Sequence, residues 1–175
     1  MMEELLLVRP KIDYLAQIYS YKQEFIDHNE NMSGTSDLRS FDNVEDWLEF
    51  VIRNEALATC TAGYVPDSQF LTIRKADQRL VGMIDVRHVL NEYLLQYAGH
   101  IGYSIRKSER QKGYAKEQLR LALTEAGKLG LSRVLITCDK ENAASRNVIL
   151  SAGGIMENEV PQDGLVTQRY WINID

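Results

Sequence analysis

The sequence has 175 residues, enough for one domain with a complete hydrophobic core. Hydrophobic residues make up 45% and charged residues 26% of the chain, a balance typical of an ordinary globular protein. Its formal net charge of -5 excludes a general nucleic-acid binder, because such proteins need a basic face to replace phosphate counterions. The first apolar run, residues 5–8, is too short for a signal core or a membrane span. Two cysteines, Cys60 and Cys138, form no disulfide framework, so we expect a cytoplasmic protein that contacts no membrane.

A short strand at residues 5–9 and two helices are expected in the N-terminal third. The first helix can begin at Pro10, since proline is tolerated in a first helical turn, and apolar residues then recur at helical spacing. The second helix has stronger signals, because Asp42 can cap it and Glu45 follows three residues later. Its apolar face consists of Val44, Trp47, Leu48 and Val51.

The remainder of the chain predicts strands interrupted by two helices. Strands are expected at residues 70–74, 80–87, 100–106, 134–138, 155–160 and 166–172, and helices at residues 113–129 and 142–150. The strand, helix and strand of residues 100–138 predict a right-handed parallel crossover. The predicted fold class is therefore α/β of the α+β kind, with a mixed, mostly antiparallel central sheet, one parallel β-α-β crossover and flanking helices.

The segment between the strand at 100–106 and the following helix has the features of a phosphate site. It reads Arg110-Gln111-Lys112-Gly113-Tyr114-Ala115, followed by Lys116. A helix start exposes unpaired N–H groups and the positive end of the helix dipole, and small residues let a ligand approach the backbone. Neither a P-loop nor a G-x-G-x-x-G fingerprint is present, so the pattern favours neither an NTPase nor a dinucleotide fold.

In this setting the chain resembles the GNAT N-acetyltransferase superfamily, whose loop reads Arg or Gln, two variable residues, Gly, one variable residue, and Gly or Ala. Arg110, Gly113 and Ala115 match that pattern. The resemblance covers residues 70–154, and residues 99–106 and 169–172 are similar to a bacterial branch of predicted acetyltransferases. It implies acetyl-CoA as cofactor and transfer of the acetyl group to a primary amine by direct attack in a ternary complex.

The resemblance also implies roles for single residues. The loop would hold the coenzyme A pyrophosphate, the preceding strand would pair with pantetheine, and the start of the helix at 142–150 would contact the pantetheine arm. The cofactor-binding candidates are Tyr103, Ser104, Ile105, Arg106, Arg110, Gln111, Lys112, Gly113, Tyr114, Ala115, Lys116, Asn142 and Ser145. Plain N-capping is the alternative for Asn142 and Ser145.

The groups that would move protons are not fixed by the resemblance. Members of the family often carry a tyrosine acid seven residues after the asparagine, but Ile149 stands there. Ser145, a nearby tyrosine or water could replace it, and the alternative function is a catalytically weak acyl-CoA-binding regulatory module. His100 is a candidate general base by its pKa, against a purely structural role, and Asp139 and Glu141 are weaker candidates. Cys138 is expected to be inert core.

The acceptor would be a small-molecule or peptide amine bound between residues 20 and 60. That region carries Glu24, Asp27, Glu30, Asp37, Asp42, Glu45, Asp46 and Glu49. These carboxylates either attract a cationic amine or are solvated helix faces. We expect a single domain, with residues 1–65 on the acceptor side, 66–154 binding acyl-CoA and 155–175 forming C-terminal strands. No metal is expected, and a homodimer is an open alternative.

Overall fold

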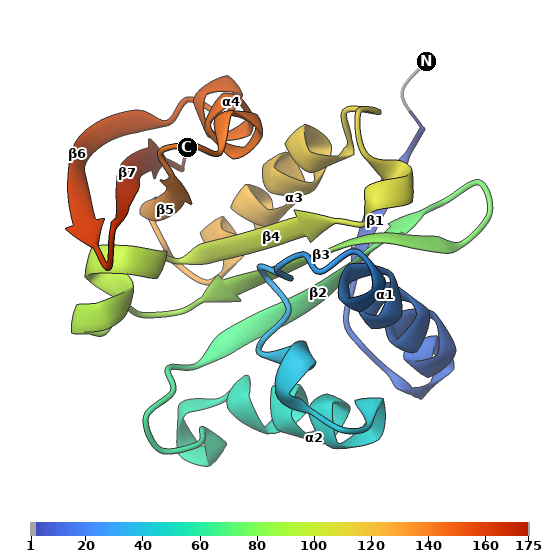
Figure 1. Ribbon diagram of the computed structural model, residues 1–175. Helices are drawn as coiled ribbons and strands as arrows, with labels where there is room; N and C mark the ends of the chain where they lie inside the picture. Colours follow the sequence, from blue (N-terminus) through green and yellow to red (C-terminus); the bar gives the residue numbers. More distant parts are fainter. Residues whose placement is uncertain (1–2, 175) are drawn as a thin grey trace.

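The computed structural model describes residues 3–174, which form two sheets flanked by helices (Figure 1). The first sheet has the order β1 (Leu5–Val8), β2 (Asp67–Arg74), β3 (Arg79–Arg87) and β4 (Ile101–Ile105), with every neighbouring pair antiparallel. The second has the order β5 (Arg133–Asp139), β7 (Leu165–Asn173) and β6 (Ile155–Gln162), again antiparallel throughout. The mixed α+β architecture predicted from the sequence is confirmed.

Four α-helices cover the sheets: α1 (Leu15–Asp27), α2 (Val44–Asn54), α3 (Tyr114–Lys128) and α4 (Ala143–Ser151). Because side chains alternate along a strand, the neighbours Phe70 and Leu71 point to opposite faces. Leu71 lies in a buried cluster with residues of α1 and α2, and Phe70 in one with residues of α3 and the second sheet. The helices therefore enclose the first sheet from both sides (Figure 1).

The strands β4 and β5 do not form the expected parallel pair within residues 3–174. They meet only at a bridge between Gly99 and Ile136, where the amide of His100 donates to the carbonyl of Leu135 at 2.7 Å. Gly99 has a φ of 69°, and a Cβ there would lie 2.3 Å from the carbonyl oxygen of Leu135, so only glycine allows this approach. Beyond this point the strands separate, and the predicted single sheet is divided in two.

The structure differs from the sequence predictions at the cap of α2 and before β4. The helix α2 is capped by Asn43, whose side chain accepts a hydrogen bond from the amide of Asp46 at 2.8 Å, so the prediction of Asp42 as cap is wrong by one residue. The apolar face predicted for α2 is confirmed, because all four of its residues are buried. A π-helical turn at Leu94–Ala98, where no element was expected, precedes β4.

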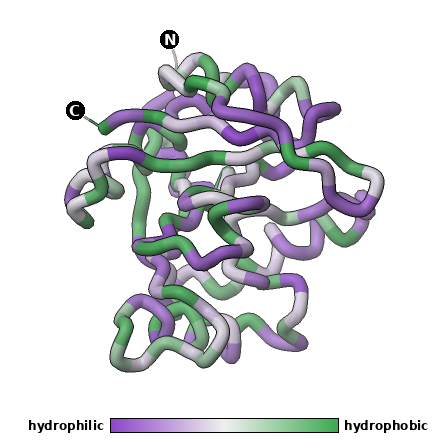
Figure 2. The backbone as a smooth tube through the Cα atoms, turned by 90° about the vertical axis from the view of Figure 1, so that its left-hand side faces the viewer, coloured by the Kyte–Doolittle hydropathy of each residue, from purple (hydrophilic) through white to green (hydrophobic). Residues whose placement is uncertain are grey.

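Hydrophobic and hydrophilic segments alternate along the backbone (Figure 2). No helix in the described part of the chain combines the length and the hydropathy needed to cross a membrane.

Candidate active site

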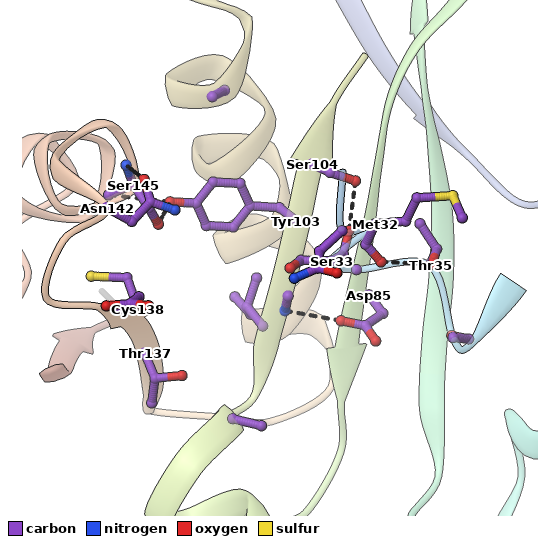
Figure 3. Close-up of a pocket in the computed structure, with 18 of the residues that line it drawn as sticks. Met32, Ser33, Thr35, Asp85, Tyr103, Ser104, Thr137, Cys138, Asn142 and Ser145 are labelled. Atoms are coloured by element: carbon purple, nitrogen blue, oxygen red, sulfur yellow. Dashed lines mark hydrogen bonds between the residues drawn. The ribbon is translucent and has the colours of Figure 1, made fainter. Parts of the chain in front are cut away.

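A cleft of about 1690 Å³ opens where β4 and β5 separate. One end is formed by the segment between β4 and α3, and the other by the loop before α2, the start of β2 and the π-helical turn. In Figure 3 the side chain of Tyr103 extends from β4 toward α4, whereas Ser33, Thr35 and Asp85 gather on the other side of that strand. The cleft therefore has a half beside α3 and α4 and a half beside β2 and β3.

The predicted phosphate loop is a backbone cradle. Gln111 and Gly113 have φ values of 62° and 82°, and Gly113 is the N-cap of α3. Within residues 3–174, the amides of residues 111–115 donate to no backbone or side-chain acceptor. Because unpaired amides at a helix N-terminus favour an anion, this geometry fits a pyrophosphate group.

The cations of the loop differ in what they can reach. Arg110 lines the cleft, donates from Nε to the carbonyl of Ile105 at 2.9 Å and pairs with Glu30 at 2.5 Å. Lys112 is drawn to Glu109 at 2.7 Å and does not line the cleft, so the structure does not support its role in binding the cofactor. Lys116 lines the cleft and forms no ion pair within the described residues.

The side chain of Arg106 does not line the cleft, although the prediction for this residue concerned its backbone. It is buried away from the cleft, where Nε pairs with Glu24 at 2.6 Å and Nη1 donates to the carbonyl of Leu80 at 3.1 Å. The side chain of Arg106 therefore fixes α1 against the end of β4. Because Glu24 and Glu30 pair with Arg106 and Arg110, these two carboxylates do not belong to the acidic rim predicted for the acceptor.

The other predicted residues of β4 and α3 do line the cleft. Tyr103, Ser104 and Ile105 face it from β4, but the hydroxyl of Ser104 donates to the carbonyl of Ser33 at 2.6 Å. Within residues 3–174, β4 has a ladder partner only on the β3 side, so its other edge is available to a ligand backbone. Tyr114 is largely buried, with its hydroxyl held by Arg74 and Glu3, and Ala115 follows it on the cleft.

The start of α4 meets β4 across the cleft. Asn142 caps the helix, accepting from the amide of Ser145 at 3.0 Å, so the capping role is confirmed, and both residues line the cleft. The hydroxyls of Ser145 and Tyr103 lie 2.8 Å apart (Figure 3). Burial raises the pKa of Tyr103 to about 12, so its proton is held at neutral pH. Ile149 is fully buried and offers no proton.

The geometry argues against His100 as general base. The ring is buried, does not line the cleft, and its Nδ1 accepts the amide of Leu135 at 2.9 Å. Burial, reinforced by the charge of Arg87, lowers the pKa of His100 to about 4. Cys138 borders the cleft, but burial raises the pKa of its thiol, so the thiol stays protonated. This agrees with the prediction that Cys138 is not a nucleophile.

Sequence reasoning missed the polar residues of β2 and β3 at the other half of the cleft. Asp67, Asp85 and Arg87 line it. Asp85 is buried, accepts the amide of Gly102 at 2.9 Å and pairs with Arg87 at 3.2 Å. The available signal was a carboxylate inside the apolar run of β3, since a buried charge in a strand needs a partner or a function.

Comparison with known proteins identifies the class. The family model described as an acetyltransferase (GNAT) domain matches residues 4–155. The chain therefore belongs to the GNAT acetyltransferase family. No curated protein matches the sequence significantly.

Solved structures of acetyltransferases share the fold. The chain is similar to RimL, the ribosomal L7/L12 alpha-N-protein acetyltransferase, in complex with coenzyme A, with 18% identity, a TM-score of 0.72, and 98% and 94% of the two chains covered. It is similar to the ribosomal-protein-S5-alanine acetyltransferase of Vibrio fischeri, with 15% identity, a TM-score of 0.72, and 100% and 94% covered. The microcin C7 self-immunity acetyltransferase MccE, in complex with acetyl-CoA and AMP, gives 18% identity, a TM-score of 0.69, and 98% and 93% covered. The structure of MccE contains acetyl-CoA, and the unpaired amides at residues 111–115 of this chain fit the pyrophosphate of such a cofactor.

Proposed function

We propose that this protein transfers the acetyl group of acetyl-CoA to a primary amine by direct attack within a ternary complex. The observation that carries the proposal is the single cleft that joins the amide cradle at residues 111–115 to the unpaired edge of β4. A cleft that holds both substrates orients the amine toward the thioester carbonyl. Direct attack can then occur without a covalent enzyme intermediate. The donor binds in the half of the cleft beside α3 and α4, and the acceptor binds in the half beside β2 and β3.

In the donor half of the cleft, both backbone amides and side chains bind acetyl-CoA. The amides of residues 111–115 bind the pyrophosphate, and Lys116 and Arg110 add positive charge beside it. The free edge of β4 at Tyr103 pairs with the pantetheine arm and supplies an N–H to the thioester oxygen. An amide held by a sheet stabilises the oxyanion because it needs no reorientation as charge develops.

Ser145 and Tyr103 replace the acid that Ile149 cannot provide. Their hydroxyls are 2.8 Å apart on opposite walls of the cleft, so a proton that leaves one can be replaced from the other. The departing thiolate takes a proton from this pair. Ser145 and a nearby tyrosine were both sequence candidates for the acid, and the 2.8 Å contact supports Tyr103 as that tyrosine.

The pair is tested by Tyr103→Phe, Ser145→Ala and the double variant. We expect kcat to fall about 10- to 100-fold in each single variant, with little further loss in the double variant, because the two hydroxyls act as a unit. Stabilisation by coenzyme A should be retained, which separates proton transfer from cofactor binding. Losses that multiply in the double variant would show that the hydroxyls act independently.

The function itself is tested in two steps. Coenzyme A should raise the melting temperature in a concentration-dependent way, because a ligand that binds only the folded state stabilises it. Thiol release from acetyl-CoA is then measured with spermidine, kanamycin and a short peptide with a free N-terminus as acceptors. Tight binding without turnover on such amines would favour the regulatory module, and the absence of any thermal shift would contradict both.

A further inference from the structure

The acceptor half of the cleft contains a carboxylate without a cationic partner. Asp67 is half-buried at the first position of β2 and lines the cleft. Among the described residues, the one hydrogen bond to its side chain comes from a neutral group, the hydroxyl of Ser36, at 2.8 Å from Oδ2. Within residues 3–174 it forms no ion pair, whereas the adjacent Asp85 is held by Arg87. Asp67 therefore has no cation in direct contact within these residues, and Arg9 and Arg87 act on it only through their longer-range charge.

The strand register relates Asp67 to the start of β4 through the intervening strand β3. Asp67 lies opposite Arg87 on β3, and the amide of Arg87 donates to the carbonyl of His100, immediately before β4. Two residues before Arg87 on β3, Asp85 accepts a hydrogen bond from the amide of Gly102, the residue before Tyr103. Asp67 thus lies on the acceptor side of the strand that is proposed to orient the thioester.

The surroundings of Asp67 make it a proton acceptor near neutral pH. Burial, and then the charge of Asp85, raises its pKa to about 6, although Ser36 and two arginines oppose this. The groups that interact electrostatically or by hydrogen bonds with Asp67 come from several elements. They are Arg9 just after β1, Ser36 and Cys60 in two loops, and Asp85 and Arg87 on β3. A base with such a pKa is ionised at pH 7 and still basic enough to take a proton from an ammonium group.

We infer that Asp67 is the general base of the acetyl transfer and the group that receives the acceptor as a primary ammonium ion. This inference rests on the proposed function. The ammonium gives one proton to Asp67 and becomes a nucleophilic amine. The amine forms a C–N bond with the thioester carbonyl, the C–S bond breaks, and the thiol leaves with a proton. The nitrogen loses its second proton as the amide forms, and this proton replaces the one that the Tyr103–Ser145 pair gives to the thiolate. Asp67 returns its own proton to solvent.

The charges around Asp67 also define the class of acceptor. On β2 and β3, two carboxylates, Asp67 and Asp85, line the cleft with one guanidinium, that of Arg87, whereas Arg9 does not line it, so a cation is favoured there. The wall beyond them is aromatic, with Phe50 packed edge-on against Tyr64 at 5.1 Å, and Tyr93 against Tyr97 at 5.3 Å. Carboxylates beside aromatic rings suit an ammonium ion carried on an apolar or further cationic body.

The other carboxylates near the thioester suit this role less well. Asp139 accepts the amide of Glu141 at 3.1 Å and so closes the turn after β5. Glu141 is exposed at the cleft edge beside α4, in the half assigned to the donor.

The test compares Asp67→Asn with Asp163→Asn, a matched change at an exposed carboxylate on the far rim of the cleft. Wild-type kcat/KM for the fastest amine among spermidine, kanamycin and the free-N-terminus peptide should rise with pH through about pH 6. In Asp67→Asn we expect kcat/KM to fall at least about 100-fold and this limb of the profile to disappear. Asp67→Glu should restore part of the activity, and Asp163→Asn should behave as wild type.

Thermal stabilisation by coenzyme A, measured on the same variants, shows that the donor half is intact. If the wild-type enzyme is active and Asp67→Asn keeps both its kcat/KM and the rise of kcat/KM near pH 6, the role of Asp67 is wrong. The proposed acetyltransferase function would then still stand. A wild-type enzyme that binds coenzyme A but acetylates none of these amines would overturn the proposed function and the inference with it.

Discussion

His100, Tyr103 and Asp67 are all titratable residues near the cleft, and burial acts on each of them differently. In His100 it disfavours the cation, and in Tyr103 it disfavours the phenolate. In Asp67 it brings a carboxylate toward the physiological range. A residue type alone therefore does not identify a base; its exposure to the cleft and its hydrogen-bond partners do.

His100→Asn tests the structural role of the histidine, because the asparagine Oδ1 can accept the amide of Leu135 in place of Nδ1. The pKa of His100 is about 4 in the folded state and near 6.5 in the unfolded state, so the unfolded state binds more protons between these values. Wild-type stability should fall as the pH is lowered through this window, by on the order of 2 kcal/mol at pH 4.5. The variant should lack this component in urea unfolding, with kcat/KM at pH 7.5 within about threefold of wild type. A loss of activity at pH 7.5 without a loss of stability would return His100 to a catalytic role.

At the scale of elements, the segment 32–36 before α2 clamps β4. The carbonyl of Gly34 accepts from Gln69 at 2.9 Å, and that of Thr35 from the indole of Trp47 at 2.8 Å. A Cβ on Gly34 would lie 2.2 Å from the carbonyl oxygen of Gly102, so this segment rests directly on the backbone of β4. The clamp leaves the opposite edge of β4 free for the cofactor.

Gly34→Ala should separate this segment from β4. Gly63→Ala is the matched control, because Gly34 and Gly63 have φ values of 72° and 87°, but nothing lies within 4 Å of a Cβ on Gly63. Both changes strain the backbone, and we expect about 1 kcal/mol of destabilisation from Gly63→Ala. Gly34→Ala should cost about 2–4 kcal/mol, since it adds a backbone clash, and urea unfolding measures both. Equal losses would show that β4 does not depend on this contact.

At the scale of the whole molecule, the proposed cofactor site lies between two sheets that share no continuous ladder within residues 3–174. They are connected by the bridge at Gly99 and by a buried cluster in which α3 contacts both sheets. A ligand bound between β4 and β5 would therefore contact both sheets and connect them where the protein has no hydrogen-bond ladder.

Hydrogen exchange can detect that effect. Saturating coenzyme A, at about 100 times its Kd, should slow exchange of the amides at residues 111–115 and 101–105 by up to about 100-fold. The strand β6, at the far edge of the second sheet, is the internal control and should change little. Protection confined to β6, or spread evenly over the chain, would contradict the proposed position of the cofactor.

The sequence by itself determined the features that depend on neighbouring residues. The periodicity of α2 and α3, the glycine at the start of α3 and the strand–loop–helix order around residues 110–115 are local patterns, and the structure shows each of them. They were sufficient for the fold class and the cofactor, because a phosphate cradle is built from consecutive amides.

The tertiary structure alone decided which polar side chains reach the cleft. Arg106 and Arg110 pair with Glu24 and Glu30 across 82 and 80 residues of chain, so neither the loop cations nor the acidic rim could be assigned from spacing. Asp67 became a candidate base only when the fold placed it on the same cleft as β4, although β3 lies between their strands. Burial and charge pairing arise from contacts between distant segments, and they set the pKa and accessibility on which proton transfer depends.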